Sequence, residues 1–283
     1  MIERLATLLV SCPDRKGIVA SLSQMLYAYG ANILDADQHT DAIAQMFFQR
    51  IRFDLSTMTT DRVALEHGIS EVAERFGMTW HISYASKLPR VAILVSKLEH
   101  CLYDLLLRHR AGELRCDVAM VISNHPDLEG VAKHFGVPYH HLPVTADTRG
   151  EQERQIIETL GDVDLVVLAR YMQILTPAVV DRFASRIINI HHSFLPAFVG
   201  ASPYRQAYDK GVKLIGATAH YVTADLDQGP IIEQGVIRCT HGDTVEDLVR
   251  KGRDVETRTL GAAVRWHVDD RILVYAGKTV VFD

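Results

Sequence analysis

Three polar side chains, an amide, an imidazole and a carboxylate, stand at the ends of two apolar segments of this 283-residue chain. Asn189 and His191 end one short apolar run, and Asp227 follows a second run at 214–222 that contains His220. An amide and an imidazole can donate hydrogen bonds to an oxyanion, while a carboxylate can set the protonation of the imidazole or accept a proton. This combination suits the attack of a nucleophile on a small carbonyl group.

Two predicted strands, 187–190 and 214–221, must bring these side chains together. We expect both strands in a mostly parallel sheet, where ligands lie beyond the carboxyl ends of the strands. Taken singly, each residue also fits a plain structural role: Asn189 as a turn cap, His191 as a hydrogen-bonded loop histidine, and Asp227 as part of a tight turn.

The whole pattern resembles the folate-dependent formyltransferase family. Residues 189–196 read Asn-Ile-His-His-Ser-Phe-Leu-Pro, and residues 220–231 read His-Tyr-Val-Thr-Ala-Asp-Leu-Asp-Gln-Gly-Pro-Ile. The resemblance implies that Asn189, His191 and Asp227 are the catalytic residues. It also implies a set of substrate-binding residues: Arg170, Tyr171, Met172, Gln173, Ile174, Leu175, His192, His220, Asp225 and Leu226.

Within that set, the segment 168–175 matches the part of the transferases whose backbone reads the pterin ring. Met172, Ile174 and Leu175 are expected to form an apolar wall of the folate site, although ordinary core packing also fits them. Arg170 fits either the glutamate tail of the folate or a surface ion pair.

The segment 96–102 separates the branches of this family. It reads Ser-Lys-Leu-Glu-His-Cys-Leu, without the glycines that let a backbone approach a phosphate, and Glu99 would repel one. A phosphorylated acceptor is therefore disfavoured. A transfer-RNA acceptor is disfavoured too, because the chain has no basic C-terminal domain and a net charge of −5.

Water is the acceptor that remains. The segment 96–102, the second histidine, His192, and residues 197–198 (Ala-Phe) resemble the hydrolase branch of the family. That branch converts 10-formyltetrahydrofolate to formate and tetrahydrofolate, and so supplies formate and balances one-carbon pools for purine synthesis. Two alternatives stay open: a formyltransferase with a non-phosphorylated amine acceptor, and a non-catalytic sensor of folate or amino acids.

In the hydrolytic reading, Asn189 and His191 donate hydrogen bonds to the formyl oxygen, and His191 is the nearest donor for the leaving N10. Asp227 either stabilises protonated His191 or takes a proton from water. We expect no metal and no cofactor beside the folate substrate, because adjacent side chains such as His191 and His192 point in different directions along a strand end. The pair His140 and His141 is expected to be solvated.

Residues 1–84 predict a separate small domain with the order βαββαβ, the ferredoxin-like plan. A helix over 18–29 carries an apolar face at three-and-four spacing and ends at Gly30. The segments 13–20 and 30–33 resemble the ACT domain, a regulatory unit that often binds amino acids between paired copies. The resemblance implies the regulatory residues Asp14, Arg15, Lys16, Gly17 and Asn32, with glycine or methionine as the effector. Pure dimerisation is the alternative role of this domain.

A linker is predicted at 85–89, followed at 90–283 by a Rossmann-like, mostly parallel α/β domain with the formyltransferase fold. Strands are expected at 90–96, 117–123, 138–142, 164–169, 187–190 and 214–221, and helices at 98–110, 128–135, 150–160, 177–183 and 203–208. An antiparallel strand at 231–238, a long helix at 244–268 and a hairpin at 271–282 are expected to close the chain.

Composition limits the remaining possibilities. The chain is 48% hydrophobic and 23% charged, which is ordinary for a globular protein. The negative net charge predicts no general attraction to nucleic acid or to anionic membranes. Four scattered cysteines and the lack of a signal-like or membrane-spanning segment predict reduced thiols and a cytoplasmic protein, which we expect to form a homo-oligomer.

Overall fold

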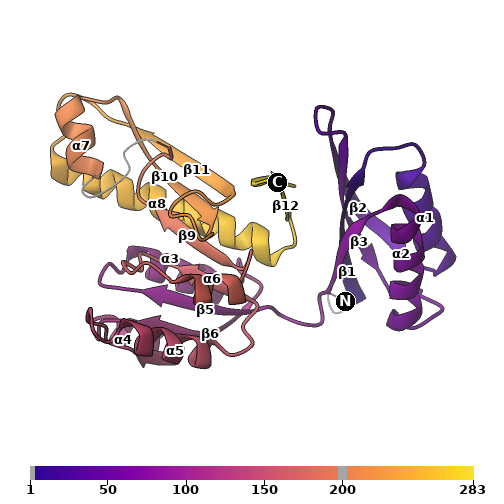
Figure 1. Ribbon diagram of the computed structural model, residues 1–283, viewed down its shortest axis with the longest axis horizontal. Helices are drawn as coiled ribbons and strands as arrows, with labels where there is room; N and C mark the ends of the chain where they lie inside the picture. Colours follow the sequence, from indigo (N-terminus) through magenta and orange to yellow (C-terminus); the bar gives the residue numbers. More distant parts are fainter. Residues whose placement is uncertain (1–3, 197–202) are drawn as a thin grey trace. The chain divides into compact units, whose positions relative to one another are not determined.

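The computed structural model describes residues 4–196 and 203–283, so Ala197 and Phe198 of the motif above lie outside the described residues. The chain divides into two compact units. The N-terminal unit comprises the residues up to Leu88 together with Asp270–Tyr275 and Val280–Asp283, and the central unit comprises Pro89–Asp269 and Ala276–Thr279. Figure 1 shows both units in the colours of the sequence.

The N-terminal unit has the predicted βαββαβ order. Its elements are β1 (Leu5–Pro13), α1 (Ile18–Ala28), β2 (Asn32–Asp41), β3 (Met46–Asp54), α2 (Arg62–Phe76) and β4 (Thr79–Tyr84). The strands form an antiparallel sheet in the order β2-β3-β1-β4. Asp61 caps α2 by accepting a hydrogen bond from the amide of Ala64, and Gly77 ends it at a φ of 63°.

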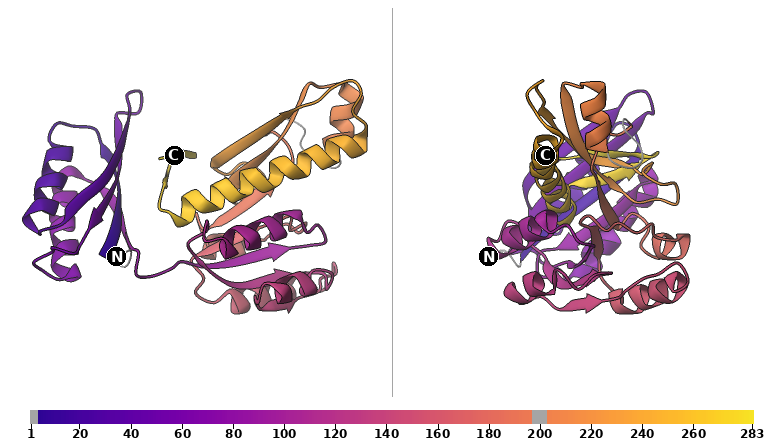
Figure 2. Two further views of the ribbon diagram at one scale, coloured as in Figure 1. Left: turned by 180° about the vertical axis from the view of Figure 1, so that it is seen from behind. Right: turned by 90° about the vertical axis from the view of Figure 1, so that its left-hand side faces the viewer.

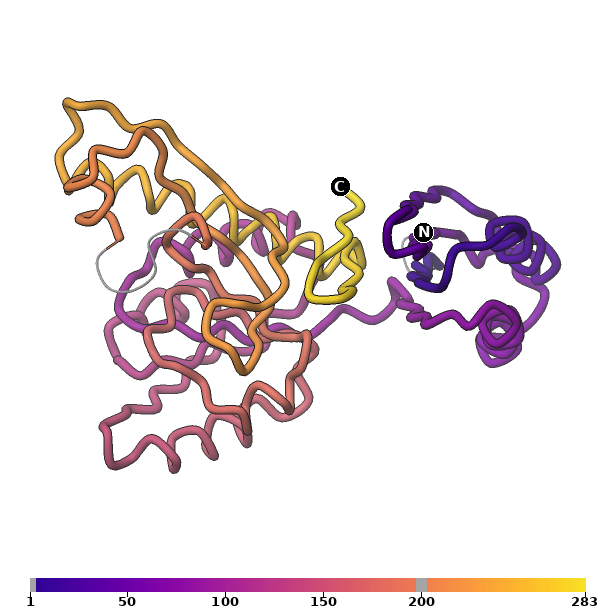
Figure 3. Tube along the Cα trace, turned by 45° about the horizontal axis from the view of Figure 1, so that its top comes forward, coloured from indigo at the N-terminus to yellow at the C-terminus, as the bar shows by residue number. Residues whose placement is uncertain are grey.

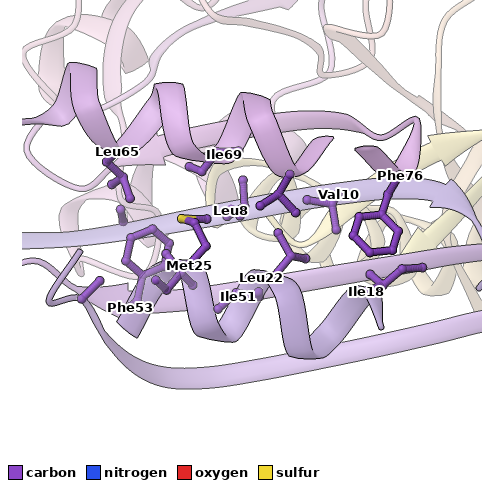
Figure 4. Close-up of a cluster of buried hydrophobic side chains, with 14 of the residues drawn as sticks. Leu8, Val10, Ile18, Leu22, Met25, Ile51, Phe53, Leu65, Ile69 and Phe76 are labelled. Atoms are coloured by element: carbon purple, nitrogen blue, oxygen red, sulfur yellow. The ribbon is translucent and has the colours of Figure 1, made fainter. Parts of the chain in front are cut away.

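One face of this sheet packs against both helices, as Figure 4 shows. Alternate residues of β1 and β3 point to this face because side chains alternate along a strand. The core that they form with the helices includes Leu8, Val10, Ile51, Phe53, Ile18, Leu22, Met25, Leu65, Ile69 and Phe76.

The opposite face of the same sheet is covered by the end of the chain. Leu9 and Phe48 point to this face and are buried with Phe282. The rings of Phe48 and Tyr275 lie 5.2 Å apart, and the buried Arg50 donates to the backbone oxygen of Asp270 at 3.0 Å. Strands β12 (Ile272–Tyr275) and β13 (Lys278–Val281) form the predicted hairpin. The prediction assigned all of it to the second domain, whereas its apolar side chains pack on the N-terminal sheet.

The central unit contains a seven-stranded sheet in the order β11-β10-β9-β8-β5-β6-β7. Its strands are β5 (Arg90–Val95), β6 (Asp117–Ser123), β7 (Tyr139–His141), β8 (Leu165–Leu168), β9 (Ile187–His191), β10 (Leu214–Tyr221) and β11 (Ile231–Arg238). Its helices are α3 (His100–Arg110), α4 (Glu129–His134), α5 (Arg149–Leu160), α6 (Pro177–Arg182), α7 (Pro203–Lys210) and α8 (Val245–Val268). These elements confirm the Rossmann-like fold expected from the sequence.

Helices cover both faces of this sheet, as the right-hand view of Figure 2 shows. Ile156 and Leu160 of α5 and Phe183, beside α6, pack with Ala92 and Leu94 of β5 on one face. Helices α3 and α8 contact each other on the other face, and α8 runs along β9, β10 and β11. The trace in Figure 3 follows this unit from β5, drawn in purple, to α8, drawn in yellow.

The direction of β10 differs from the prediction. Strands β9, β8, β5, β6 and β7 are parallel, but β10 is antiparallel to both of its neighbours, β9 and β11. The carboxyl ends of β9 and β10 therefore do not meet at one edge of the sheet. Instead, cross-strand register places His220 directly opposite Asn189 and Thr218 opposite His191.

Candidate active site

The pairing of β9 with β10 brings the amide of Asn189 to the imidazole of His220. The side-chain nitrogen of Asn189 lies 3.3 Å from Nε2 of His220, and Nδ1 of the same ring lies 2.9 Å from the backbone oxygen of Tyr221. A carbonyl oxygen can only accept, so Nδ1 carries a proton, and in this tautomer Nε2 accepts from the amide of Asn189. His220 thereby fixes which way the amide of Asn189 points.

Asp227 reaches this pair from the loop that follows β10. Its backbone has a φ of 56°, in the left-handed region that Asp tolerates better than most residues. Two residues on, a side-chain carbon at Gly229 would lie 1.7 Å from the backbone oxygen of Tyr221, so the loop can lie this close to β10 only with glycine there. The loop conformation thus determines where the carboxylate lies.

His191 and Asp227 form the central hydrogen-bonded pair of the site. Nδ1 of His191 lies 3.2 Å from Oδ2 of Asp227, and Nε2 of His220 lies 3.7 Å from the other carboxylate oxygen. The neighbouring imidazoles of His191 and then of His220 hold the pKa of the Asp227 carboxyl well below its usual value, so the group is ionised at neutral pH. Nε2 of His191 is buried and has no hydrogen-bond partner among the described residues, which leaves it available to a substrate.

A cavity of about 610 Å³ opens beside Asp227. Its walls are mainly apolar and include Leu195, Pro196, Leu226 and Ile231, with Gln228 and Lys278 as polar groups. Thr218 holds the Leu195 side of this cavity by donating to the backbone oxygen of Ser193 and accepting from the amide of Leu195, both at 3.0 Å. Of the two predicted binding residues in this loop, Leu226 lines the cavity, whereas Asp225 is exposed and does not line it.

The predicted folate segment after β8 is tied to the ends of β5 and β6. The buried hydroxyl of Ser96 accepts from the amide of Met172 at 3.0 Å and donates to Oδ1 of Asn124 at 2.7 Å. Ser96 follows β5, Asn124 follows β6 and Met172 follows β8, so the carboxyl ends of these three strands meet here. The strand order reverses at this point, where α/β sheets commonly bind ligands.

The side chains of this segment divide into exposed and buried ones. Met172 and Ile174 are 57% and 59% exposed and can form an apolar wall, and Gln173 is half-buried. Leu175 packs against the core, and the buried Tyr171 is also part of it, where its hydroxyl accepts from Gln152 at 3.4 Å. Tyr171 therefore supports the segment from within and offers no side chain to a ligand.

Arg170 takes neither of the two roles considered for it. Its backbone has a φ of 63°, and its side chain is buried, with Nε 3.5 Å from Oε2 of Glu256. The expectation of a surface ion pair is wrong, and the guanidinium is directed to the interior instead of a folate tail. The partner carboxylate lies on α8, a helix in which the sequence indicated no site residue.

Glu256 is the centre of a buried polar cluster, which we call the Glu256 cluster: His100, Arg170, Tyr204 and Glu256. Tyr204 donates to Oε1 of Glu256 at 2.5 Å, and Nε2 of His100 lies 2.7 Å from Oε2. Burial by itself would raise the pKa of this carboxyl, but hydrogen bonding from His100, the charge of Arg170 and the hydroxyl of Tyr204 lower it below the usual value. Glu256 is therefore ionised although only 1% of it is exposed.

A sequence signal for Glu256 existed. On α8 it shares one face with Leu248, Gly252, Thr259, Leu260 and Ala263, which are buried. A carboxylate on the apolar face of an amphipathic helix must find partners inside the protein. The remaining candidate, His192, is half-buried, and its ring centroid lies 5.3 Å from that of His191 and 6.2 Å from that of Tyr204.

One group of side chains in the described residues could hold a metal ion: His100, Cys101 and Glu256, whose ligand atoms lie within 4.8 Å of one another. Its chemistry fits a cation poorly. The guanidinium of Arg170 already lies beside the carboxylate, and burial and then the charge of Glu256 raise the pKa of the Cys101 thiol well above its usual value. A protonated thiol is not a good metal ligand.

The predicted regulatory residues lie in the N-terminal unit. Asp14, Arg15, Lys16 and Gly17 form an exposed loop before α1, where Gly17 has a φ of 96°. Asn32 is exposed at the start of β2 and pairs with Asp54, whereas Pro13 pairs with Met46 eight residues along the same strand. At ~3.3 Å per residue the loop and Asn32 are about 26 Å apart. One chain therefore does not bring them into one pocket.

Known families match most of the chain. The formyl transferase family matches residues 89–264, and the ACT domain family matches residues 6–74. A formyltetrahydrofolate deformylase of Synechocystis sp. is 53% identical over 98% of this chain and 98% of its own length. No helix in the described residues combines the length and the apolar character needed to cross a membrane.

Solved structures similar to this chain point to the same family. The crystal structure of a formyltetrahydrofolate deformylase from Pseudomonas syringae pv. tomato superposes with a TM-score of 0.96 at 46% identity, covering 99% of this chain and 94% of that one. A glycinamide ribonucleotide transformylase from Symbiobacterium toebii, at 37% identity and a TM-score of 0.66, covers only 69% of this chain but 95% of its own. With a formyl transferase domain after an ACT domain and relatives that match it from end to end, the chain belongs to the formyltetrahydrofolate deformylase family.

Proposed function

We propose that this protein hydrolyses 10-formyltetrahydrofolate to formate and tetrahydrofolate. The observation that carries the proposal is the connected group of Asn189, His191, His220 and Asp227. It stands in a chain that is similar to formyltetrahydrofolate deformylases over its full length.

The geometry suggests a role for each catalytic group. The amide of Asn189 keeps one N–H free of His220, and this N–H stabilises the formyl oxygen as it becomes an oxyanion. His191 presents Nε2 to the substrate while the ionised carboxylate of Asp227 holds Nδ1. Protonated His191 then supplies the proton that N10 needs when it leaves.

The substrate's folate body needs an apolar surface with backbone hydrogen-bonding groups. We assign this role to the segment from Arg170 to Leu175, through its backbone and the exposed side chains of Met172 and Ile174, and to Leu226 beside the cavity. Gln173, His192, His220 and Asp225 complete the proposed binding region. The mechanism needs no metal or further cofactor.

The proposal extends to the biological setting. Hydrolysis would release formate for purine synthesis and return tetrahydrofolate to the one-carbon pool in the cytoplasm. We assign residues 1–84 to regulation or dimerisation, 85–89 to the linker and the chain from residue 90 to catalysis, except for the C-terminal strands that pack on the N-terminal sheet. Glycine or methionine would bind at the ACT-like domain, and a homo-oligomer would combine the loop at 14–17 of one copy with Asn32 of another.

The test measures tetrahydrofolate and formate released from 10-formyltetrahydrofolate by the purified protein without any added acceptor. We expect both products in equal amounts. A reaction that starts only when an amine is added would instead identify a formyltransferase, and folate binding without turnover would identify a sensor.

A further inference from the structure

We propose that His192 orients the water that attacks the formyl group, and that Glu256 positions His192 through Tyr204. The inference rests on the proposed hydrolysis and adds two residues to it. A hydrolase must hold a water molecule where a transferase holds an amine, so a group beside the catalytic histidine has to accept a hydrogen bond from that water.

His192 has the right position and an unused ring. It follows His191 directly, and the two ring planes are tilted by 35° with centroids 5.3 Å apart. The side chain is half-buried, and among the described residues no hydrogen-bond partner exists for either ring nitrogen. A polar ring beside the reaction centre therefore has its hydrogen-bonding capacity free for a small molecule.

Tyr204 lies beside the His192 ring and is itself held in place. The ring of Tyr204 lies 6.2 Å from that of His192, and its hydroxyl donates to Glu256. Glu256 is held in turn by His100 and lies beside Arg170. Because Glu256 is charged and buried, moving Tyr204 would remove a hydrogen bond from a carboxylate in the interior, which is costly. The fixed position of Tyr204 therefore limits the orientations that the His192 ring can take.

Burial, together with the charge of Arg170, favours the neutral form of His192. Burial, and then the charge of Arg170, lower the pKa of His192 to about 4, and His191 acts in the same direction. Glu256 and Asp227 oppose this shift but do not cancel it. A neutral imidazole keeps a lone pair that can accept from water, whereas the neighbouring His191 is paired with an ionised carboxylate and suits proton donation.

The proposed step balances as follows. A lone pair of the water oxygen forms a bond to the formyl carbon, the C=O π electrons move to oxygen, and one water proton passes to His192. The C–N10 bond then breaks, and N10 takes the proton of His191. Formic acid loses its proton to solvent, and the proton on His192 returns to His191. The net reaction consumes one water and yields tetrahydrofolate, formate and one proton.

The first experiment compares His192→Ala with His191→Ala, using exposed His141→Ala as the matched control. We expect His192→Ala to lower kcat by roughly 10²–10⁴-fold, the usual effect of an acid–base group, with little change in KM. Hydroxylamine, a stronger nucleophile than water, should restore tetrahydrofolate formation in His192→Ala and give formohydroxamate, but should not rescue His191→Ala. The His141→Ala variant should behave like the wild type.

The outcomes separate the two proposals. A wild-type protein that releases no formate would overturn the proposed function and this inference together. An active wild type with an equally active His192→Ala variant would overturn the inference alone. Equal rescue of His192→Ala and His191→Ala by hydroxylamine would also overturn it, because His192 would then have no role specific to water.

The second experiment tests the positioning role of Glu256. The pKa of His192 is measured by NMR of ring-labelled protein, with its signal assigned by its loss in His192→Ala. Glu256→Gln keeps the shape but removes a negative charge, so this pKa should fall, whereas Arg170→Met should raise it. We also expect kcat to fall in Glu256→Gln and in Tyr204→Phe, with KM nearly unchanged. A His192 pKa that responds to neither charge would show that the Glu256 cluster is only structural.

Discussion

Tyr204 occupies the space that a side chain at position 252 would need. A carbon atom added to Gly252 would lie 2.1 Å from the hydroxyl oxygen of Tyr204. Because Gly252 has no side chain, the ring of Tyr204 can lie close against α8, and its hydroxyl can reach Glu256 one helical turn further along that helix. A glycine in the middle of a long helix, which weakens a helix by itself, is thus explained by the buried hydrogen bond that it permits.

Gly252→Ala should therefore destabilise the protein by about 1–3 kcal/mol, because the added methyl group must displace Tyr204. The free energy of unfolding in urea measures this change. Gly150→Ala on α5 is the control, since nothing lies within 4 Å of the added carbon and alanine favours a helix; it should stabilise by about 0.5–1 kcal/mol. Equal effects at both sites would contradict the packing argument.

His220→Ala should lower kcat because it releases the amide of Asn189. We expect a smaller loss than the roughly 10²–10³-fold that removal of an oxyanion donor causes, which Asn189→Ala measures directly. Steady-state kinetics of both variants give the comparison. If His220→Ala lost more activity than Asn189→Ala, His220 would have a direct chemical role instead of an orienting one.

His191→Ala should lower the rate by roughly 10²–10⁴-fold, the usual contribution of a general acid or oxyanion donor. Folding should change little because His191 is the last residue of β9, and circular dichroism with a thermal scan checks this. Near-normal turnover in this variant would exclude the catalytic assignment.

Asp227→Asn keeps the shape of the side chain and removes its charge. Turnover should collapse while folate binding persists, because the pterin contacts are assigned to the backbone of residues 170–175. Titration of tetrahydrofolate by calorimetry gives the binding, and formate release gives turnover. In the double variant with His191→Ala the loss should be no greater than for the worse single variant, since the two residues act as one pair.

The low pKa of His192 predicts a specific pH dependence of stability. Above pH 6.5 the ring is neutral in both the folded and the unfolded state and contributes nothing. Between pH 6.5 and about 4 the unfolded chain binds a proton that the folded protein does not, so stability falls as the pH falls. His192→Gln should reduce the loss between pH 7 and pH 5 by about 1–2 kcal/mol, allowing for partial exposure. Parallel loss in both proteins would show that the ring titrates normally.

The sequence predicted the individual elements well because they depend on local patterns. Periodicity located α1 of the N-terminal unit, and the long helix expected at 244–268 is α8. The direction of β10 was not predictable in this way. A helix between two strands is typical of a parallel crossover, and α7 suggested one, but strand direction depends on long-range pairing with β9 and β11.

The sequence predicted that Asn189, His191 and Asp227 meet, but for a reason that proved partly wrong. Asn189, His191 and Asp227 do meet, yet cross-strand pairing with an antiparallel β10 joins them, not the carboxyl ends of parallel strands. Glu256 was not predicted because the sequence signal came from polar residues at strand ends, whereas Glu256 lies on a helix far along the chain. Arg170 was misjudged for the same reason: its partner is not visible in its own segment.

Leu273, Tyr275 and Phe282 pack on the N-terminal sheet, so the central unit is inserted within the sequence of the N-terminal unit. The chain leaves the N-terminal fold at residues 85–89 and returns to it after Asp269. A protein that simply starts near Lys87 would expose these apolar side chains, so an isolated catalytic fragment has to end near Asp269 as well. By the same topology, one proteolytic cut in the linker would not release the N-terminal unit, since its last strands remain covalently part of the other fragment.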